Sequence, residues 1–399
     1  MERLKKTIDF DVAHTIFGKS SAGINWSVIA SKREKSSLDY LPALDGLRAV
    51  AVLSVIFGHA RIPGFSAGGM GVDVFFVLSG YLITRVLVVM LSEKRAISEF
   101  YWSRFTRLFP PLLLTCLSLY LLPDSYLTKW GATLNTLGAL SYVSNWTRAF
   151  PVMGWPSYMA HSWSLSVEEQ FYLLWPGIIF VISKLANNRM SQIVFGMCLL
   201  SIAWVCTLVL LGASKDHIYN GSDARCVPIM IGSSLAFIPL LRPGKIIVAS
   251  AVVAYFGAVA FLTRTVPTAA AIWLASIVLL EVARDPNASG IVSSILRWRP
   301  FVFVGVISYA LYLWHFPIFI ALDRAEIHPL ISAPVGIGLS FALAYLTRIF
   351  VEIPFLNIRN SVRGRRRIYI GRLCFALTFL SFISGMVFFF GRFIKDAPY

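Results

Sequence analysis

The sequence predicts an all-α polytopic membrane protein, a bundle of about 10–11 transmembrane helices. Three observations support this fold class: 57% of the 399 residues are hydrophobic, only 14% are charged, and the mean hydropathy is +0.70. A soluble domain carries about 25% charged residues, so this composition excludes a water-soluble fold.

Apolar windows longer than about 15 residues follow one another through the chain, separated by turn residues and charges. They lie near residues 45–62, 72–92, 108–123, 169–186, 192–213, 226–241, 246–263, 267–283, 300–321, 331–352 and 370–391. Several are shorter than the roughly 20 residues of a straight span, so one or two are expected to merge or to re-enter the membrane from one side.

The basic residues indicate which loops share a side of the membrane. When the loops alternate from a cytoplasmic amino terminus, the inside segments collect 24 Lys and Arg residues and the outside segments collect nine. The net charge of +16 therefore reflects topology, together with attraction to anionic lipid head groups or an anionic cytoplasmic ligand. No soluble basic domain is visible that would bind nucleic acid.

The longest stretch predicted to be non-helical, residues 123–167, lies on the outer side and is rich in Trp, Tyr, Asn, Gly and Pro. It is either a lid or acceptor-binding surface, or an interfacial aromatic loop that only anchors the protein.

The five cysteines and six histidines are scattered along the chain. Their spacing matches neither a disulfide framework nor a metal site, so we predict no bound metal.

The first predicted span carries two ionisable groups on one face. Arg48 and His59 are eleven residues apart, so a helix places them within about 20° of each other and roughly 16 Å apart along its axis. Placing an ionisable group in the hydrocarbon of a membrane costs free energy, so such groups face a protein interior or a water-filled cavity. His59 can transfer a proton near neutral pH, and Arg48 can bind an anion that enters from the cytoplasm. A hydrogen-bonded structural histidine is the alternative for His59.

Small residues surround Asp73 in the stretch GFSAGGMGVDVFFVLSGYLI. Glycines let two helices approach closely and let a ligand lie against the backbone. The alternative is that they serve only in helix packing. Ser79 lacks the elbow motif of a serine nucleophile.

Arg104 and Arg107 stand three residues apart in YWSRFTRLFPP, on one face of a helix. Two guanidinium groups so placed can fork around phosphates or a nucleotide. Ordinary positive-inside charge is the alternative. The surrounding Trp and Tyr residues, and a position on the same side as Arg48, favour a ligand.

The segment HSWSLSVEEQFYLLWP is predicted to enter a helix near Ser166, with Ser166 as N-cap and Glu169 as its capping-box partner. Glu168 then points about 100° away from Glu169 and can enter the bundle, where a carboxylate can orient a histidine or accept a hydroxyl hydrogen bond. Near another helix end, Arg348 and Glu352 at i and i+4 are predicted to form a structural ion pair.

Together these blocks resemble the acyltransferase-3 family of membrane O-acyltransferases, which modify lipopolysaccharide O-antigen, peptidoglycan, Nod factors, exopolysaccharides and some macrolides. The resemblance runs from Tyr40 to about Pro354. It is carried by YLPALDGLRAVAVLSVIFGH, GVDVFFVLSGYLIT, FYWSRFTRLFPP, HSWSLSVEEQFYLLWP, Tyr219 to Gly232, and VISYALYLWHFPIF.

The resemblance implies transfer of an acyl group, usually acetyl, from acyl-CoA on the cytoplasmic side to a carbohydrate hydroxyl of the cell envelope or of an exported glycan. We accordingly predict His59, Arg48 and Glu168 as catalytic residues, and Arg104 and Arg107 with Arg48 as contacts of the CoA phosphates. The predicted substrate-binding residues are Asp73, Ser79, Glu169, Tyr172, Arg225, Tyr312 and His315.

A transporter or sensor that uses the buried arginine and histidine without acyl transfer is the alternative function. Inverted repeats would support it, and none is visible in the sequence.

The expected organisation is a cytoplasmic tail over residues 1–40, which show no secretory signal, and a membrane acyltransferase domain over 41–356. Residues 357–399 are expected to hold a basic cytoplasmic loop, the last transmembrane helix and a short tail. The expected location is the inner membrane of a bacterial cell.

Many envelope members of the family continue into an extracytoplasmic hydrolase-like domain, whereas here only GRFIKDAPY follows the last predicted helix. Either the membrane domain acts alone on its acceptor, or a separate extracytoplasmic transferase receives the acyl group.

Overall fold

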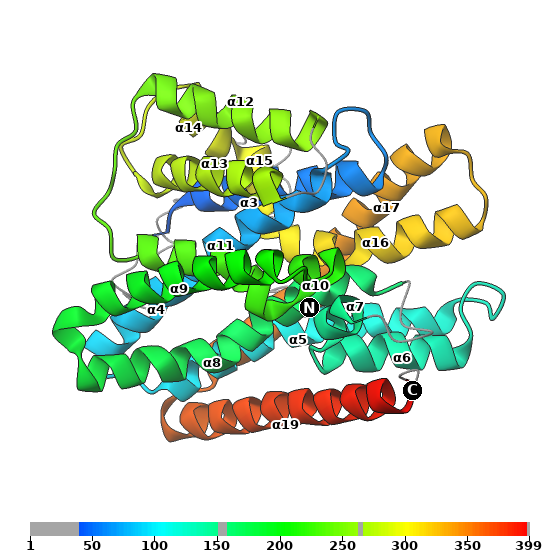
Figure 1. Cartoon of the computed structure of the whole chain (residues 1–399). Coiled ribbons are helices and arrows are strands. Elements are labelled where there is room, and N and C mark those ends of the chain that lie inside the picture. Colours follow the sequence, from blue (N-terminus) through cyan, green and yellow to red (C-terminus); the bar gives the residue numbers. More distant parts are fainter. Residues whose placement is uncertain (1–39, 151–157, 262–265, 397–399) are drawn as a thin grey trace, which may run out of the picture.

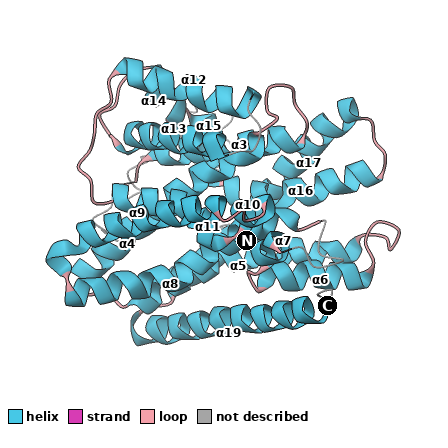
Figure 2. Ribbon diagram, viewed as in Figure 1, coloured by secondary structure: helices cyan, strands magenta, loops and turns pink. Residues whose placement is uncertain are grey.

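The computed structural model describes residues 40–150, 158–261 and 266–396, and each regular element in these ranges is a helix (Figures 1 and 2). The α-helices are α3 (Pro42–His59), α4 (Val72–Ser92), α5 (Ile97–Ser118), α6 (Lys129–Leu140), α7 (Ser144–Ala149), α8 (Trp163–Leu185), α9 (Met190–Leu210), α10 (Lys215–Asn220), α11 (Ser222–Leu235), α12 (Lys245–Phe261), α13 (Val266–Arg284), α14 (Ile291–Leu296), α15 (Arg299–Val306), α16 (Ser308–Arg324), α17 (Pro329–Thr347), α18 (Ile353–Ser361) and α19 (Gly364–Asp396). The predicted all-α class is confirmed. The predicted amino-terminal tail lies outside the described residues, apart from its last position.

Each predicted apolar window coincides with a helix, or in one case with the pair α15 and α16. Within the described residues, six helical segments are long and apolar enough to cross a membrane, or seven if α15 and α16 form one span bent by 69°. One of the six joins α17, a π-helical turn and α18 into a continuous segment of 33 residues. The chain is therefore a multi-pass membrane protein.

The connections gather at the two ends of the bundle, as Figure 1 shows. The α8–α9 turn, the α11–α12 connection and the start of α19 lie at the left end of that view. The loop after α3 and the α16–α17 turn lie at the right end. These are the two groups of loops that the charge pattern assigns to opposite sides of the membrane.

The α3 and α4 helices form the buried centre of the fold. Most of α3 is buried, and it packs against α13, α15 and α16. The α4 helix packs closely on α11, because Gly80 faces the α11 backbone and Gly232 faces the α4 backbone. A Cβ atom on either would lie 1.9 Å from a carbonyl oxygen of the partner helix. The predicted role of small residues in close helix approach is therefore confirmed at Gly80.

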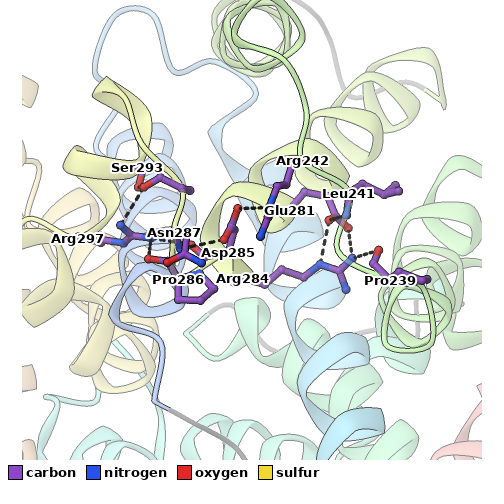
Figure 3. A network of polar contacts seen from close by, with 11 residues as sticks. Pro239, Leu241, Arg242, Glu281, Arg284, Asp285, Pro286, Asn287, Ser293 and Arg297 are labelled. Atoms are coloured by element: carbon purple, nitrogen blue, oxygen red, sulfur yellow. Dashed lines mark hydrogen bonds and ion pairs between the residues drawn. The ribbon is translucent and has the colours of Figure 1, made fainter.

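A polar network closes the end of α13, as Figure 3 shows. Arg284 pairs with Glu281 at 2.8 Å and donates to the backbone carbonyls of Leu235, Ile238 and Pro239. Nearby, Asp285 accepts from Arg242 at 3.2 Å, and Arg297 donates to three further carbonyls. We call Arg242, Glu281, Arg284, Asp285 and Arg297 the arginine clamp. It ties α13 to the segments that follow α11 and precede α14.

Two predictions about segment 123–167 are wrong. The segment contains α6 and α7 and the start of α8, although its residues 151–157 lie outside the described residues. The Thr128 hydroxyl caps α6 by accepting from the Gly131 amide at 3.1 Å, a local signal that the aromatic composition concealed. Ser166 lies inside α8, not at its N-cap, and its hydroxyl donates to the Ser162 carbonyl at 3.1 Å.

The predicted structural ion pair at the end of α17 is confirmed, since Arg348 lies 2.6 Å from Glu352. The segment predicted as a basic loop beyond residue 357 is largely helical, because α18 and α19 occupy it. The last helix also runs further than predicted, to Asp396.

Candidate active site

A pocket opens between α3, α4, α5, α8 and α16 and encloses about 720 Å³, part of it open to the surroundings. We call it the arginine pocket. Its polar lining includes Arg48, Ser79, Arg104, Arg107, Ser164, Glu168, Tyr172, Ser308, Tyr309 and Tyr312. Predicted site residues from five separate motifs therefore meet around one space.

Arg48 reaches the pocket from the first turns of α3. Its guanidinium pairs with the Asp45 carboxylate one turn earlier at 2.5 Å, and Asp45 also accepts from the Tyr40 hydroxyl at 2.8 Å. The side chain of Arg48 keeps 20% of its surface exposed. One carboxylate thus orients Arg48 while leaving other guanidinium donors for a ligand.

Arg104 and Arg107 enter the pocket together from one face of α5. The Arg104 guanidinium lies 5.3 Å from the ring centres of both Phe100 and Tyr172. Neither arginine forms a hydrogen bond or an ion pair with any group in the described part of the chain. Two guanidinium groups without acceptors therefore face the same space as a third arginine, and guanidinium donors of this kind suit phosphate or carboxylate oxygens.

A hydrogen-bonded group of side chains also lines the pocket. The Ser79 hydroxyl donates to Glu168 Oε1 at 2.7 Å, and the Tyr172 hydroxyl lies 3.0 Å from Ser79 Oγ and 3.3 Å from Glu168 Oε2. The Glu168 carboxylate is therefore held by groups from α4 and α8. Since Ser79 donates its hydrogen to Glu168, its role in this arrangement is to position the carboxylate.

Three histidines gather where α3 and α16 meet the 3-10 turn Ala160–Ser162 that precedes α8, and we call His59, His161 and His315 the histidine cluster. His59 Nδ1 lies 3.2 Å from His315 Nε2. The rings of His161 and His315 are 5.4 Å apart, and Phe316 packs against both His59 and His161 at 5.0 Å. His161 and His315 are buried, at 3% and 0% exposure.

A comparison with known protein families identifies the family of this chain. Residues 41–349, most of the chain, match the family described as an acyltransferase domain. The chain belongs to this acyltransferase family. The family resemblance predicted from the motifs is confirmed.

Curated relatives of the acyltransferase include two bacterial proteins. The peptidoglycan O-acetyltransferase OatA of Listeria monocytogenes is 31% identical over 351 residues, which are 80% of this chain and 56% of that protein. The O-acetyltransferase OatA of Staphylococcus aureus is 30% identical over 354 residues, 82% of this chain and 58% of that protein. The chain therefore spans little more than half the length of these relatives. No solved structure matches it.

Tyr312 connects the two halves of the acyltransferase site. Its side chain lines the arginine pocket, and its hydroxyl bonds to Ser164 Oγ at 2.6 Å and to the His161 carbonyl at 2.8 Å. The rings of His161 and His315 lie 5.2 and 5.4 Å from the Tyr312 ring. Tyr312 thus stands between the arginine pocket and the histidine cluster.

Glu169 faces away from the arginine pocket of the acyltransferase. It lines a smaller space of about 380 Å³ between α5, α8 and α19, together with Tyr142. Arg104 lines both spaces. Glu168 and Glu169 therefore occupy different surroundings, as their 100° separation on a helix requires.

Asp73 and Arg225 lie apart from both spaces and pair with each other. Arg225 lies 3.0 Å from Asp73, and Trp273 donates to the same carboxylate at 2.8 Å. The Arg225 guanidinium also lies 5.1 Å from the ring centre of Tyr219. This buried pair joins α4, α11 and α13, so the structure places these two predicted substrate-binding residues in the packing of the fold.

Sequence reasoning missed three contributors to the site: Asp45, which holds Arg48; Ser164, which bonds Tyr312; and His161 in the histidine cluster. Ser164 and His161 both belong to the HSWSL motif. Their spacing gave no sign of a meeting with α16, because that contact is made between segments about 150 residues apart.

Proposed function

We propose that this chain is a membrane O-acyltransferase that moves an acyl group, acetyl in the first instance, from acyl-CoA to a carbohydrate hydroxyl. The acceptor belongs to the cell envelope or to an exported glycan, and peptidoglycan is the first candidate because of the relatives' names. The observation that carries the proposal is the arginine pocket, where Arg104 and Arg107 present guanidinium donors beside Arg48.

The chemistry of the pocket fits acyl-CoA as the donor. Phosphate oxygens accept bidentate hydrogen bonds from guanidinium groups, and CoA carries its phosphates on the part of the molecule remote from the thioester. The pocket brings Arg48, Arg104 and Arg107 to one space. With the phosphates held by the arginines, the flexible pantetheine arm extends past Tyr312 toward the histidine cluster.

Two routes of transfer lead from this arrangement, and both use His59. In the first, His59 accepts the proton of the acceptor hydroxyl while that oxygen attacks the thioester carbon. The C–O bond forms, the C–S bond breaks, and the CoA thiolate takes the proton from His59. In the second, His59 itself attacks the thioester carbon, the C–S bond breaks and the CoA thiolate leaves. The acceptor hydroxyl then attacks the acyl group on His59, the C–N bond breaks, and the hydroxyl proton goes to the CoA thiolate.

The proposed location is the inner membrane of a bacterial cell, with a cytoplasmic amino terminus. The excess of basic residues in one set of loops and the bacterial origin of the relatives support it. In this orientation Arg48, Arg104 and Arg107 lie toward the cytoplasm, where acyl-CoA is found. The acyl group then passes either directly to the acceptor or to a separate extracytoplasmic transferase.

The test uses the purified full chain in lipid nanodiscs with labelled acetyl-CoA and peptidoglycan glycan fragments as the acceptor. We expect CoA release together with labelled, base-labile ester on the glycan. His59→Ala should abolish both while the protein remains in the membrane. His328→Asn is the matched control, because His328 is exposed and Asn keeps its role as the N-cap of α17. Full transfer by His59→Ala overturns the proposal. Absence of CoA release by the parent chain with any carbohydrate acceptor does so too, in favour of a transporter or sensor.

A further inference from the structure

We propose that His315 is a positioning residue that fixes the tautomer of His59, so that His59 Nε2 is the atom that reacts. The inference rests on the proposed function, because only acyl transfer gives His59 a reactive role. It deepens that function by assigning the roles of all four ring nitrogens of the pair.

The first step concerns His315 Nδ1, which faces the backbone of its own helix. It lies 2.7 Å from the Tyr312 carbonyl oxygen and 3.2 Å from the Leu311 carbonyl oxygen. A carbonyl oxygen only accepts hydrogen bonds, so Nδ1 must carry the hydrogen.

The second step concerns the charge of His315. Its side chain is fully buried, at 0% exposure, against the rings of Tyr312, Phe316 and His161. Its polar contacts in the described residues are two backbone carbonyls and the Nδ1 atom of His59, with no carboxylate among them. A second proton would place an unpaired cation in this surrounding, at a high cost in free energy. His315 is therefore neutral, and its Nε2 carries no hydrogen.

The third step follows from the contact between the two rings. His59 Nδ1 lies 3.2 Å from the unprotonated His315 Nε2, so His59 Nδ1 must be the donor. A neutral imidazole has one N–H, which leaves His59 Nε2 with its lone pair. Proton abstraction and acyl attack both need that lone pair.

The Phe316 ring holds the geometry from the side. It packs edge-on against His59 at 5.0 Å and stacks on His161 at 5.0 Å, while the α16 backbone anchors His315. The orientation of the His59 ring thus depends on α16, which also supplies Tyr312 at the arginine pocket. A group that fixes both tautomer and ring direction is what a general base requires.

The direct test is nitrogen NMR of the full chain in lipid nanodiscs, labelled with ¹⁵N-histidine, at a pH where both residues are neutral. His59→Gln and His315→Gln variants assign the two sets of signals. We expect a protonated Nδ1 and an unprotonated Nε2 in both residues. A protonated Nε2 in His59, or a protonated Nε2 in His315, overturns the inference. The measurement needs no substrate, so it stands even if acyl transfer is not observed.

A pair of variants gives the functional test. In His315→Gln the amide oxygen can still accept from His59 Nδ1, so we expect less than about a tenfold loss of kcat. In His315→Leu the acceptor is gone, so we expect a loss of about 10²–10⁴-fold with an unchanged KM for acyl-CoA, and a His59 spectrum of mixed tautomers. Equal activity of the two variants overturns the inference. If the Leu variant fails to fold, the parent spectrum and the Gln variant decide.

Discussion

Two groups of arginines in this molecule have opposite relations to their surroundings. In the arginine clamp, Arg284 has a carboxylate and three backbone carbonyls as acceptors, and Arg297 has three carbonyls (Figure 3). In the arginine pocket, Arg104 and Arg107 have no hydrogen-bond acceptor among the described residues. The same type of side chain therefore holds helix ends together in one place and has unused hydrogen-bond donors in the other.

The difference has a physical cause. A buried guanidinium costs free energy unless its donors are satisfied, so a protein that only needs stability satisfies them from its own backbone, as the clamp does. Leaving donors unsatisfied costs stability, and a binding site accepts that cost because the ligand supplies the acceptors. The comparison predicts that variants of the arginine clamp lose stability, whereas variants of the arginine pocket lose affinity for acyl-CoA.

The largest expected effect is on stability, in Arg284→Met. The change removes the charge, keeps the length, and leaves the buried Glu281 carboxylate with the Leu241 amide but without its cation. Breaking a buried pair on one side costs about 3–5 kcal/mol. We expect a clearly lowered thermal unfolding midpoint in nanodiscs, with an unchanged KM for acyl-CoA in whatever fraction stays folded. An unchanged midpoint would show that the clamp does not stabilise the fold.

The second largest effect is expected on the binding of acyl-CoA, in Arg107→Met. Loss of charge-assisted bonds to phosphate costs about 1.5–3 kcal/mol, so the KM for acyl-CoA should rise about 10–100-fold. The thermal midpoint without ligand should be equal to or above that of the parent, because the change removes unsatisfied donors and breaks no hydrogen bond or ion pair within the described chain. Arg189→Met is the matched control, since Arg189 is exposed and outside the pocket. A fall in midpoint like that of Arg284→Met would remove the distinction between the two groups.

A third test asks whether the pocket binds an anion at all. Pyrophosphate at ten times its Kd should stabilise the parent chain by about 1.4 kcal/mol, since a ligand that binds only the folded state adds RT ln(1 + [L]/Kd). The double variant Arg104→Met with Arg107→Met should show no such shift, whereas Arg284→Met should keep it. Equal stabilisation of all three proteins would place the anion elsewhere.

Most of the fold could be predicted from the sequence because membrane helices depend on local apolarity. Every predicted window holds a helix, since a span must satisfy its backbone hydrogen bonds within itself. Segment 123–167 failed for the complementary reason. The α6 and α7 helices mix Trp, Asn and Thr with apolar residues, and their helical state depends on the Thr128 cap and on packing against neighbouring helices, not on hydrophobicity.

The candidate site could be predicted only as far as single helices carry it. The spacing of Arg48, Arg104 and Arg107 within their helices led to the arginine pocket. The contact between His59 and His315 could not be found in that way, because it spans 256 residues of sequence and depends on how α3 meets α16. For the same reason spacing could not show that Asp73 pairs with Arg225 away from the pocket.

The smallest expected effect comes from the exposed edge of the clamp. Arg242 pairs with Asp285 at 3.2 Å, but its side chain is 69% exposed, so water and salt screen the pair. Arg242→Met should change the free energy of unfolding by about 0–1 kcal/mol and leave the KM for acyl-CoA unchanged. Measured beside Arg284→Met, it separates burial from charge as the source of the clamp's stability. If Arg242→Met destabilised the protein as much as Arg284→Met, the clamp's contribution to stability would depend on the number of arginines and not on the acceptors around each one. The contrast with the arginine pocket would then need another cause.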